Sequence, residues 1–318
     1  MGSDVFLKNS KVYARIKNIR HKGGKDMEHP QLTRFFSWVI PVFVMIVFQG
    51  FSTVSAGDTA NQLAEQYLKK VPVTRFDAKM TMEEAEKVQE EFVAQLVKEF
   101  GEPVGYKAGL TNPDVQKVFG VSNPVRGTLL KKMILQSGSV IRADFGARPM
   151  CEGDLIVRVG NEAINQAKTP EETLKCIDAA IPFIELPDLV YDKSVKLNGP
   201  ALVAINVGAR YGVAGEAIEI KATPEWKDRL KNFTLRIYDE KGALASEGKG
   251  SSLLGDPLNV VFWIKNSLAA EGKKLKKGDL LSLGSLTKMI PSKPASSIRA
   301  SYIGLNPEGP VEITVTFK

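Results

Sequence analysis

The acidic residues best placed for chemistry lie in two short apolar segments of this chain. Glu152 and Asp154 stand two apart in the run Cys-Glu-Gly-Asp-Leu-Ile-Val, and Glu185 ends the run Pro-Phe-Ile-Glu. In a β-strand, residues two apart share a face, so the Glu152 and Asp154 carboxylates would repel each other. A hard divalent cation such as Mg²⁺ prefers carboxylate oxygens and would offset that repulsion. The alternative is an exposed edge strand on which both carboxylates are hydrated.

Lys107 is the candidate group for proton transfer. It lies between Gly105 and Gly109 in the run Gly-Tyr-Lys-Ala-Gly. Glycines allow a backbone to approach a ligand closely, and a lysine beside a metal can have its pKa lowered into a useful range. Glu185 follows apolar residues and needs a partner there, which a shared metal would supply. A hydrated lysine in a glycine-rich loop is the alternative for Lys107.

Histidine chemistry is excluded from most of the chain. The two histidines, His21 and His29, both precede an uncharged stretch at residues 35–57. If that stretch ends a removable leader, the mature protein contains no imidazole. Ser-His-Asp and Cys-His nucleophiles, His-ligated zinc and a His general base are then all excluded.

Residues 1–56 have the pattern of a secretory leader. Eight basic and three acidic residues occupy positions 1–34, an uncharged apolar core follows, and Val54, Ser55 and Ala56 provide small residues at its end. This pattern predicts export to the periplasm. The alternative is a membrane anchor at residues 35–57, because the uncharged run is long enough to span a bilayer.

The leader also accounts for most of the net charge. Its first 34 residues supply five of the seven net positive charges. The remainder is therefore nearly neutral, and we expect no nucleic-acid partner and no membrane contact other than an uncleaved leader.

The part after the leader is predicted to be α+β. An N-terminal helical region at 57–104 contains a capping box, Thr81 with Glu84, and helices are also predicted after Thr169 and Asp256. Short runs rich in Val, Ile, Leu and Phe, separated by Gly, Pro and Asn, predict a β-rich domain at 105–318. The predicted strands are 139–142, 154–159, 183–186, 202–207, 233–238, 280–283, 297–303 and 311–317.

Read together, these segments resemble the 2-keto-4-pentenoate hydratase and 4-oxalocrotonate decarboxylase family of the fumarylacetoacetate hydrolase superfamily. The resemblance covers nearly the whole chain after the leader, in order. The matching segments are 106–113, 119–121, 127–129, 152–154, 182–185, 250–259 with Trp263, 278–279 and 284–285.

The resemblance implies a fumarylacetoacetate-hydrolase-like core, a mixed β-sandwich or roll, that holds one Mg²⁺ or Mn²⁺. It implies that the metal ligands are Glu152, Asp154 and Glu185 and that Lys107 transfers a proton or stabilises an oxyanion. The residues expected to bind substrate are Arg126, Asn198 and Ser285.

The implied activity is that of an exported metal-dependent lyase: hydration of a small 2-hydroxy-dienoic or 2-oxo acid, or the related decarboxylation. We also expect a homo-oligomer. The chain departs from the family pattern at Asp154, where a Glu is usual, at Val125-Arg126-Gly127 in place of Asp-Phe-Gly, and at Leu197-Asn198-Gly199-Pro200 in place of Asp-Asn-Ala-Ser. Arg126 could instead clamp a second carboxylate of a dicarboxylic substrate. The alternatives are an acylpyruvate-type C–C hydrolase and an exported binding protein for 2-oxo acids without turnover.

Overall fold

The computed structural model describes residues 55–318. The predicted leader therefore lies outside the described residues, apart from its last two positions, and export stays a prediction. Within residues 55–318, no helix is both long enough and apolar enough to cross a membrane.

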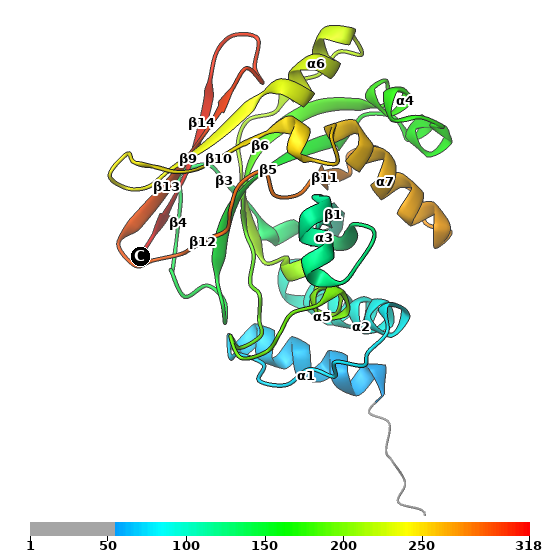
Figure 1. The fold of residues 1–318 in the computed structure, drawn as a ribbon, viewed down its shortest axis with the longest axis vertical. Coiled ribbons are helices and arrows are strands. Elements are labelled where there is room, and N and C mark those ends of the chain that lie inside the picture. Colours follow the sequence, from blue (N-terminus) through cyan, green and yellow to red (C-terminus); the bar gives the residue numbers. More distant parts are fainter. Residues whose placement is uncertain (1–54) are drawn as a thin grey trace, which may run out of the picture. The chain divides into compact units, whose positions relative to one another are not determined.

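Two β-sheets form the body of the protein (Figure 1). The larger has the strand order β2-β1-β11-β5-β6-β7-β3, with β12 on β5 and β8 on β6, and the smaller has the order β10-β9-β13-β14-β4. The strands of the larger sheet are β1 (Pro103–Gly109), β2 (Val125–Leu130), β3 (Ile134–Gln136), β5 (Met150–Val159), β6 (Ile177–Leu186), β7 (Tyr211–Ala214), β8 (Ile218–Glu219), β11 (Leu280–Ser282) and β12 (Ile290–Pro291). Those of the smaller sheet are β4 (Ser139–Ile141), β9 (Thr234–Tyr238), β10 (Leu244–Lys249), β13 (Ser296–Ile303) and β14 (Val311–Phe317).

Seven α-helices surround the sheets in the described part of the chain. Five of them begin in the same way: an Asn, Thr or Asp caps the helix, and a proline occupies its first or second position. This arrangement satisfies free N–H groups and presets the first helical φ angle. The helices are α1 (Ala56–Lys69), α2 (Met82–Phe100), α3 (Pro113–Phe119), α4 (Pro170–Leu174), α5 (Gly199–Ala204), α6 (Pro224–Asn232) and α7 (Pro257–Ala270).

The central strands β5 and β6 are buried along almost their whole length. The main core cluster lies between the two sheets and under α7, and a second cluster packs α1 and α2 against α5. Tyr302 on β13 joins the sheets, because its hydroxyl accepts a hydrogen bond from the Phe183 N–H and lies 2.7 Å from the carbonyl oxygen of Asp154. Tyr302 thereby ties both long strands, β5 and β6, to the smaller sheet.

The predicted α+β class is confirmed, and two local predictions need correction. Residues 202–207 were expected to form a strand, but they belong to α5 and the 3₁₀ turn η3 (Asn206–Gly208). A short, fully buried apolar run does not distinguish helix from strand, whereas the Asn198 cap and Pro200 begin a helix here. The helical region also contains a break between α1 and α2, at residues 70–81.

Candidate active site

Strands β5 and β6 bring the three predicted carboxylates to one face of the larger sheet. The antiparallel register places Glu152 directly opposite Glu185, and Asp154 follows two residues along β5. Because side chains alternate along a strand, all three project from the same face. All three are at most 4% exposed, so the hydrated edge strand considered as an alternative is excluded.

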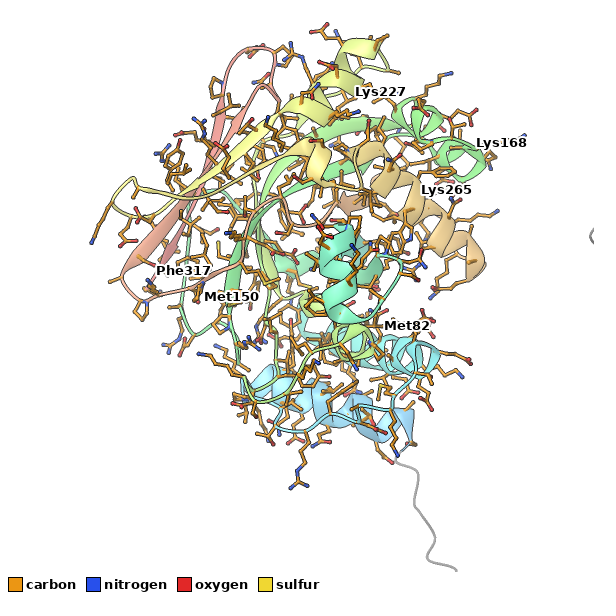
Figure 2. All side chains as sticks on the ribbon, viewed as in Figure 1. Met82, Met150, Lys168, Lys227, Lys265 and Phe317 are labelled. Carbon is orange, nitrogen blue, oxygen red and sulfur yellow. The ribbon has the colours of Figure 1, made fainter. Side chains whose placement is uncertain are left out.

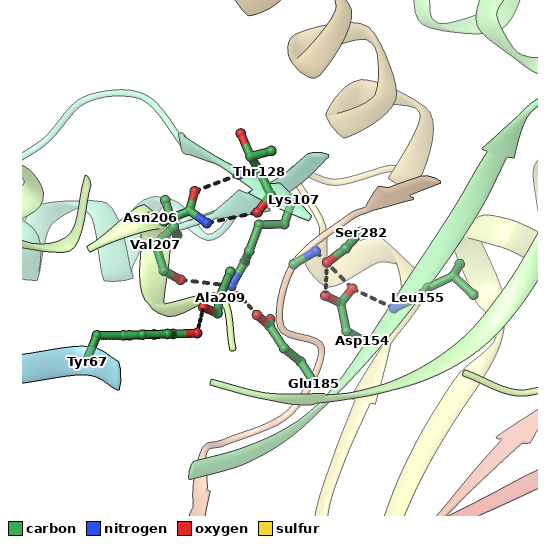
Figure 3. A network of polar contacts seen from close by, with 11 residues as sticks. Tyr67, Lys107, Thr128, Asp154, Leu155, Glu185, Asn206, Val207, Ala209 and Ser282 are labelled. Atoms are coloured by element: carbon green, nitrogen blue, oxygen red, sulfur yellow. Dashed lines mark hydrogen bonds and ion pairs between the residues drawn. The ribbon is translucent and has the colours of Figure 1, made fainter. Parts of the chain in front are cut away.

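Lys107 reaches the same group from β1. It pairs in register with Ser282 of β11, which pairs in turn with β5, so its side chain shares the face of the carboxylates. Its ammonium forms an ion pair with Glu185 and donates a hydrogen bond of 2.9 Å to the carbonyl oxygen of Val207 (Figure 3). Lys107 is 3% exposed, so the interpretation as a hydrated loop lysine is also excluded.

The backbone that receives Lys107 is held in an uncommon conformation. Asn206 and Val207 both have φ of 55°, a region that a β-branched residue such as valine rarely adopts. The Asn206 side chain fixes this turn by accepting from the Thr128 N–H at 2.7 Å and donating to the Thr128 carbonyl at 2.8 Å. A Cβ at Gly127 would lie 2.6 Å from the Asn206 carbonyl oxygen, so glycine is needed for this close approach. The turn thus directs the Val207 carbonyl at the lysine.

Asp154 is surrounded by hydrogen-bond donors. One carboxylate oxygen accepts from the Gly284 N–H at 2.9 Å and from the Leu155 N–H, and the other accepts from the Ser282 hydroxyl (Figure 3). Sequence reasoning missed Ser282 and Gly284. The available signal was a serine inside the apolar strand Leu280–Ser282, where a buried hydroxyl needs a partner.

The electrostatics of the site disfavour three bare carboxylates. Burial, and secondly the nearby Glu185, raise the pKa of Glu152 well above its usual range, although Lys107 and the neighbouring Ser285 act against this. The same two causes raise the pKa of Asp154 to about 8, opposed mainly by the Ser282 hydrogen bond. In addition, the buried Oε2 atom of Glu152 has no hydrogen-bond partner. An added positive charge would stabilise the ionised forms.

The described residues best suited to hold a hard cation are Glu152, Asp154 and Glu185. Their carboxylate oxygens do not converge on one point in this structure. Across residues 55–318, no three His, Cys, Asp or Glu side chains are gathered as a ready metal site. Glu185 is turned to Lys107, and Asp154 is turned to Ser282 and Gly284.

The structure does not bring Arg126 to this group. Arg126 stands opposite Ala108 in the β1–β2 register, so its side chain leaves the sheet on the face opposite to Lys107. There it donates two hydrogen bonds to Glu271, at 2.6 and 2.7 Å, and one to the Ser267 hydroxyl. It lines a separate pocket of about 890 Å³ between α2, β2 and α7. Its expected role as a clamp for a substrate carboxylate is therefore not supported.

The other two predicted substrate residues lie in different settings. Ser285 lies beside Glu152, whose pKa it lowers, and its hydroxyl donates a hydrogen bond to the Thr287 carbonyl. Asn198 caps α5, where its side-chain oxygen accepts from the Ala201 N–H at 2.9 Å. This contact explains the asparagine structurally, without a ligand.

The sequence is similar to enzymes named as hydratases and decarboxylases. It is 28% identical over 241 residues to a protein named TodF product hydratase from Pseudomonas putida, covering 74% of this chain and 86% of the relative. It is 24% identical over 237 residues to a 4-oxalocrotonate decarboxylase from a Pseudomonas species, covering 74% of this chain and 89% of the relative. No family model matches the chain. These relatives are named as a hydratase and a decarboxylase, both of which are lyases.

A solved structure shares the fold. The 4-oxalocrotonate decarboxylase from Pseudomonas putida G7, in complex with magnesium and adipate, matches with a TM-score of 0.74 and 22% identity, covering 83% of this chain and 97% of that chain. A second structure of that decarboxylase holds calcium and acetate and matches with a TM-score of 0.72. The predicted fold, a β-rich core with N-terminal helices, is confirmed, and so is the predicted resemblance to 2-keto-4-pentenoate hydratases and 4-oxalocrotonate decarboxylases.

Proposed function

We propose that this chain, a relative of the 2-keto-4-pentenoate hydratases and 4-oxalocrotonate decarboxylases, is a divalent-metal-dependent lyase that acts on a small 2-hydroxy-dienoic or 2-oxo acid. The observation that carries the proposal is the buried face formed by Glu152, Asp154 and Glu185 beside Lys107. Burying such a group is costly unless the charges are paired, yet the three carboxylates are buried on β5 and β6, the two longest strands of the described residues.

A divalent cation fits the donor set. If the three carboxylates are ionised, Lys107 balances one of three negative charges, and the remaining two match the charge of Mg²⁺ or Mn²⁺. The free Oε2 atom of Glu152 and the raised pKa of Asp154 both indicate groups that lack a positive partner. Similar proteins of known structure were solved with magnesium or calcium, which supports the assignment. Glu152, Glu185 and Asp154 would hold the ion.

The bound cation would supply Lewis-acid stabilisation of negative charge developing on the C2 oxygen of the substrate. The chain's own residues would do the rest. Lys107 holds a proton at Nζ and is the group we assign to its delivery, because residues 55–318 contain no histidine. The Val207 carbonyl orients that ammonium, and the Ser282 hydroxyl with the Gly284 N–H orients Asp154. The surrounding burial excludes bulk water from the proton-transfer path.

Hydration is favoured over decarboxylation of a dicarboxylic acid. A dicarboxylic substrate would need a cation for its second carboxylate, and the residue expected to serve, Arg126, is on the opposite face and engaged by Glu271. A hydrolase that activates water through a His–Glu pair is disfavoured by the lack of histidine in residues 55–318.

We expect Mg²⁺-dependent loss of 2-hydroxypenta-2,4-dienoate when the full chain is assayed by ultraviolet absorbance. Chelation of divalent ions should abolish the loss, and added Mg²⁺ should restore it. Parallel assays with 4-oxalocrotonate separate the two lyase activities. Metal and ligand binding without turnover of either compound would contradict the enzymatic proposal and support the binding-protein alternative.

A further inference from the structure

We propose that Lys107 is the built-in competitor of the metal: its ion pair with Glu185 and the binding of a divalent cation by Glu185 exclude each other. Metal entry then releases the ammonium that we assign to proton delivery. This inference rests on the proposed function and adds an ordered step to it, in which the cation must bind before the lysine is free to act.

The ion pair occupies one of the two carboxylate oxygens of Glu185, a residue that we assign to the cation. The Lys107 ammonium contacts Oε1 of Glu185, and both side chains are 3% exposed. An ammonium this close to a carboxylate oxygen would face a dication on the same carboxylate at short range, without water between them. Two positive charges in a buried site repel each other, so each weakens the hold of the other on Glu185, and on this ground we infer that the two exchange.

Metal binding would require fewer contacts to break at the other two carboxylates, Asp154 and Glu152. Asp154 is held by three hydrogen bonds, from Ser282, Leu155 and Gly284. Glu152 already presents Oε2 without a partner. The contact that must break to complete a three-carboxylate site is therefore the one between Glu185 and Lys107.

The lysine has a second anchor that survives the exchange. Its hydrogen bond to the Val207 carbonyl belongs to the turn fixed by Asn206 and Thr128, which makes no contact with the carboxylates. After release from Glu185, Lys107 would keep this one bond and direct its remaining N–H protons elsewhere. An ammonium has three donors, so at least one becomes available to a substrate.

The test is Mg²⁺ affinity, measured by isothermal titration calorimetry on the full chain. Lys107→Met removes the competing charge and keeps a side chain of similar length. Mg²⁺ should therefore bind to this variant at least about tenfold more tightly than to the original chain. Lys265→Met is the matched control, because Lys265 on α7 is also a buried lysine and donates a hydrogen bond to the Ala167 carbonyl (Figure 2). It should leave the affinity within about twofold, well below the tenfold threshold.

Lys107→Arg provides a variant that keeps the charge if the methionine variant fails to fold. It should bind Mg²⁺ no more tightly than the original chain. Crystal structures of the original chain with and without Mg²⁺ give a measurement that needs no variant: with Mg²⁺, Nζ should leave Glu185 and remain on the Val207 carbonyl.

The outcomes separate this inference from the proposed function. Equal Mg²⁺ affinity of the original chain and Lys107→Met, or a lysine that stays on Glu185 with metal bound, would overturn the competition while leaving the metal site intact. Failure of both proteins to bind Mg²⁺ would overturn the metal-dependent function as well. Tighter Mg²⁺ binding by Lys107→Met, with unchanged affinity in Lys265→Met, supports the competition.

Discussion

Lys107→Met should lower the kcat for hydration by about 10²–10⁴-fold, the usual contribution of a positioned general acid or base. Among residues 55–318, Lys107 is the only basic side chain that forms an ion pair with one of the three site carboxylates, through Glu185. Methionine preserves the length and the packing of the side chain but carries no proton. Steady-state kinetics at saturating Mg²⁺ measure the effect.

Two controls define what this loss means. Lys265→Met should keep kcat within about threefold of the original value. The Lys265 ammonium contacts the Ala167 carbonyl and the Phe262 ring, so its loss removes no group from the site. Lys107→Arg keeps the positive charge but does not give up a proton at neutral pH, so it should lose turnover almost as strongly. Undiminished turnover in Lys107→Met would remove the catalytic assignment.

Asp188→Ala should lower the free energy of unfolding by about 3–5 kcal/mol, because it leaves a buried arginine without its partner. Asp188 is fully buried and accepts hydrogen bonds from the backbone N–H groups of Ala147, Arg148 and Val190, at 2.8 to 3.0 Å. It also pairs with Arg210 at 3.1 Å. Urea denaturation followed by circular dichroism measures the change.

The Asp188 network matters because it fixes the end of the strand that carries Glu185. Asp188 lies two residues beyond the end of β6, and Arg210 extends the network to α1, where its guanidinium lies 4.2 Å from the Tyr67 ring centroid and donates to the Tyr67 carbonyl. Asp144→Ala is the control, because its pair with Arg142 is mostly exposed and should contribute little to the free energy of unfolding. A loss below 1 kcal/mol for Asp188→Ala would show that the network is not structural.

The sequence predicts which residues could do chemistry better than it predicts the contacts that hold them in place. Strand periodicity alone places Glu152 and Asp154 on one face, and the structure shows that face buried. That Glu185 and Lys107 meet them depends on the β5–β6 and β1–β11 registers, which local patterns do not specify. The resemblance to known enzymes supplied this convergence, and the geometry agrees with it.

Other parts could not be inferred locally. The turn at Asn206 and Val207 depends on the hydrogen bonds between Asn206 and Thr128, which is far away in sequence. The helix before the turn was missed for a different reason, because a short buried apolar run does not distinguish helix from strand. The direction of Arg126 follows from its pairing with Ala108, and a shift of one residue would have placed it beside Lys107. The turn and the direction of Arg126 both depend on long-range pairing.

A crystal structure of the full chain soaked with Mn²⁺, with anomalous scattering used to locate the ion, tests the metal site most directly. We predict one strong anomalous peak within about 2.0–2.3 Å of carboxylate oxygens from Glu152 and Glu185, with Asp154 as the third acidic neighbour. A peak elsewhere, or no peak while the three carboxylates stay in their present contacts, would contradict a metal-dependent lyase built on this face.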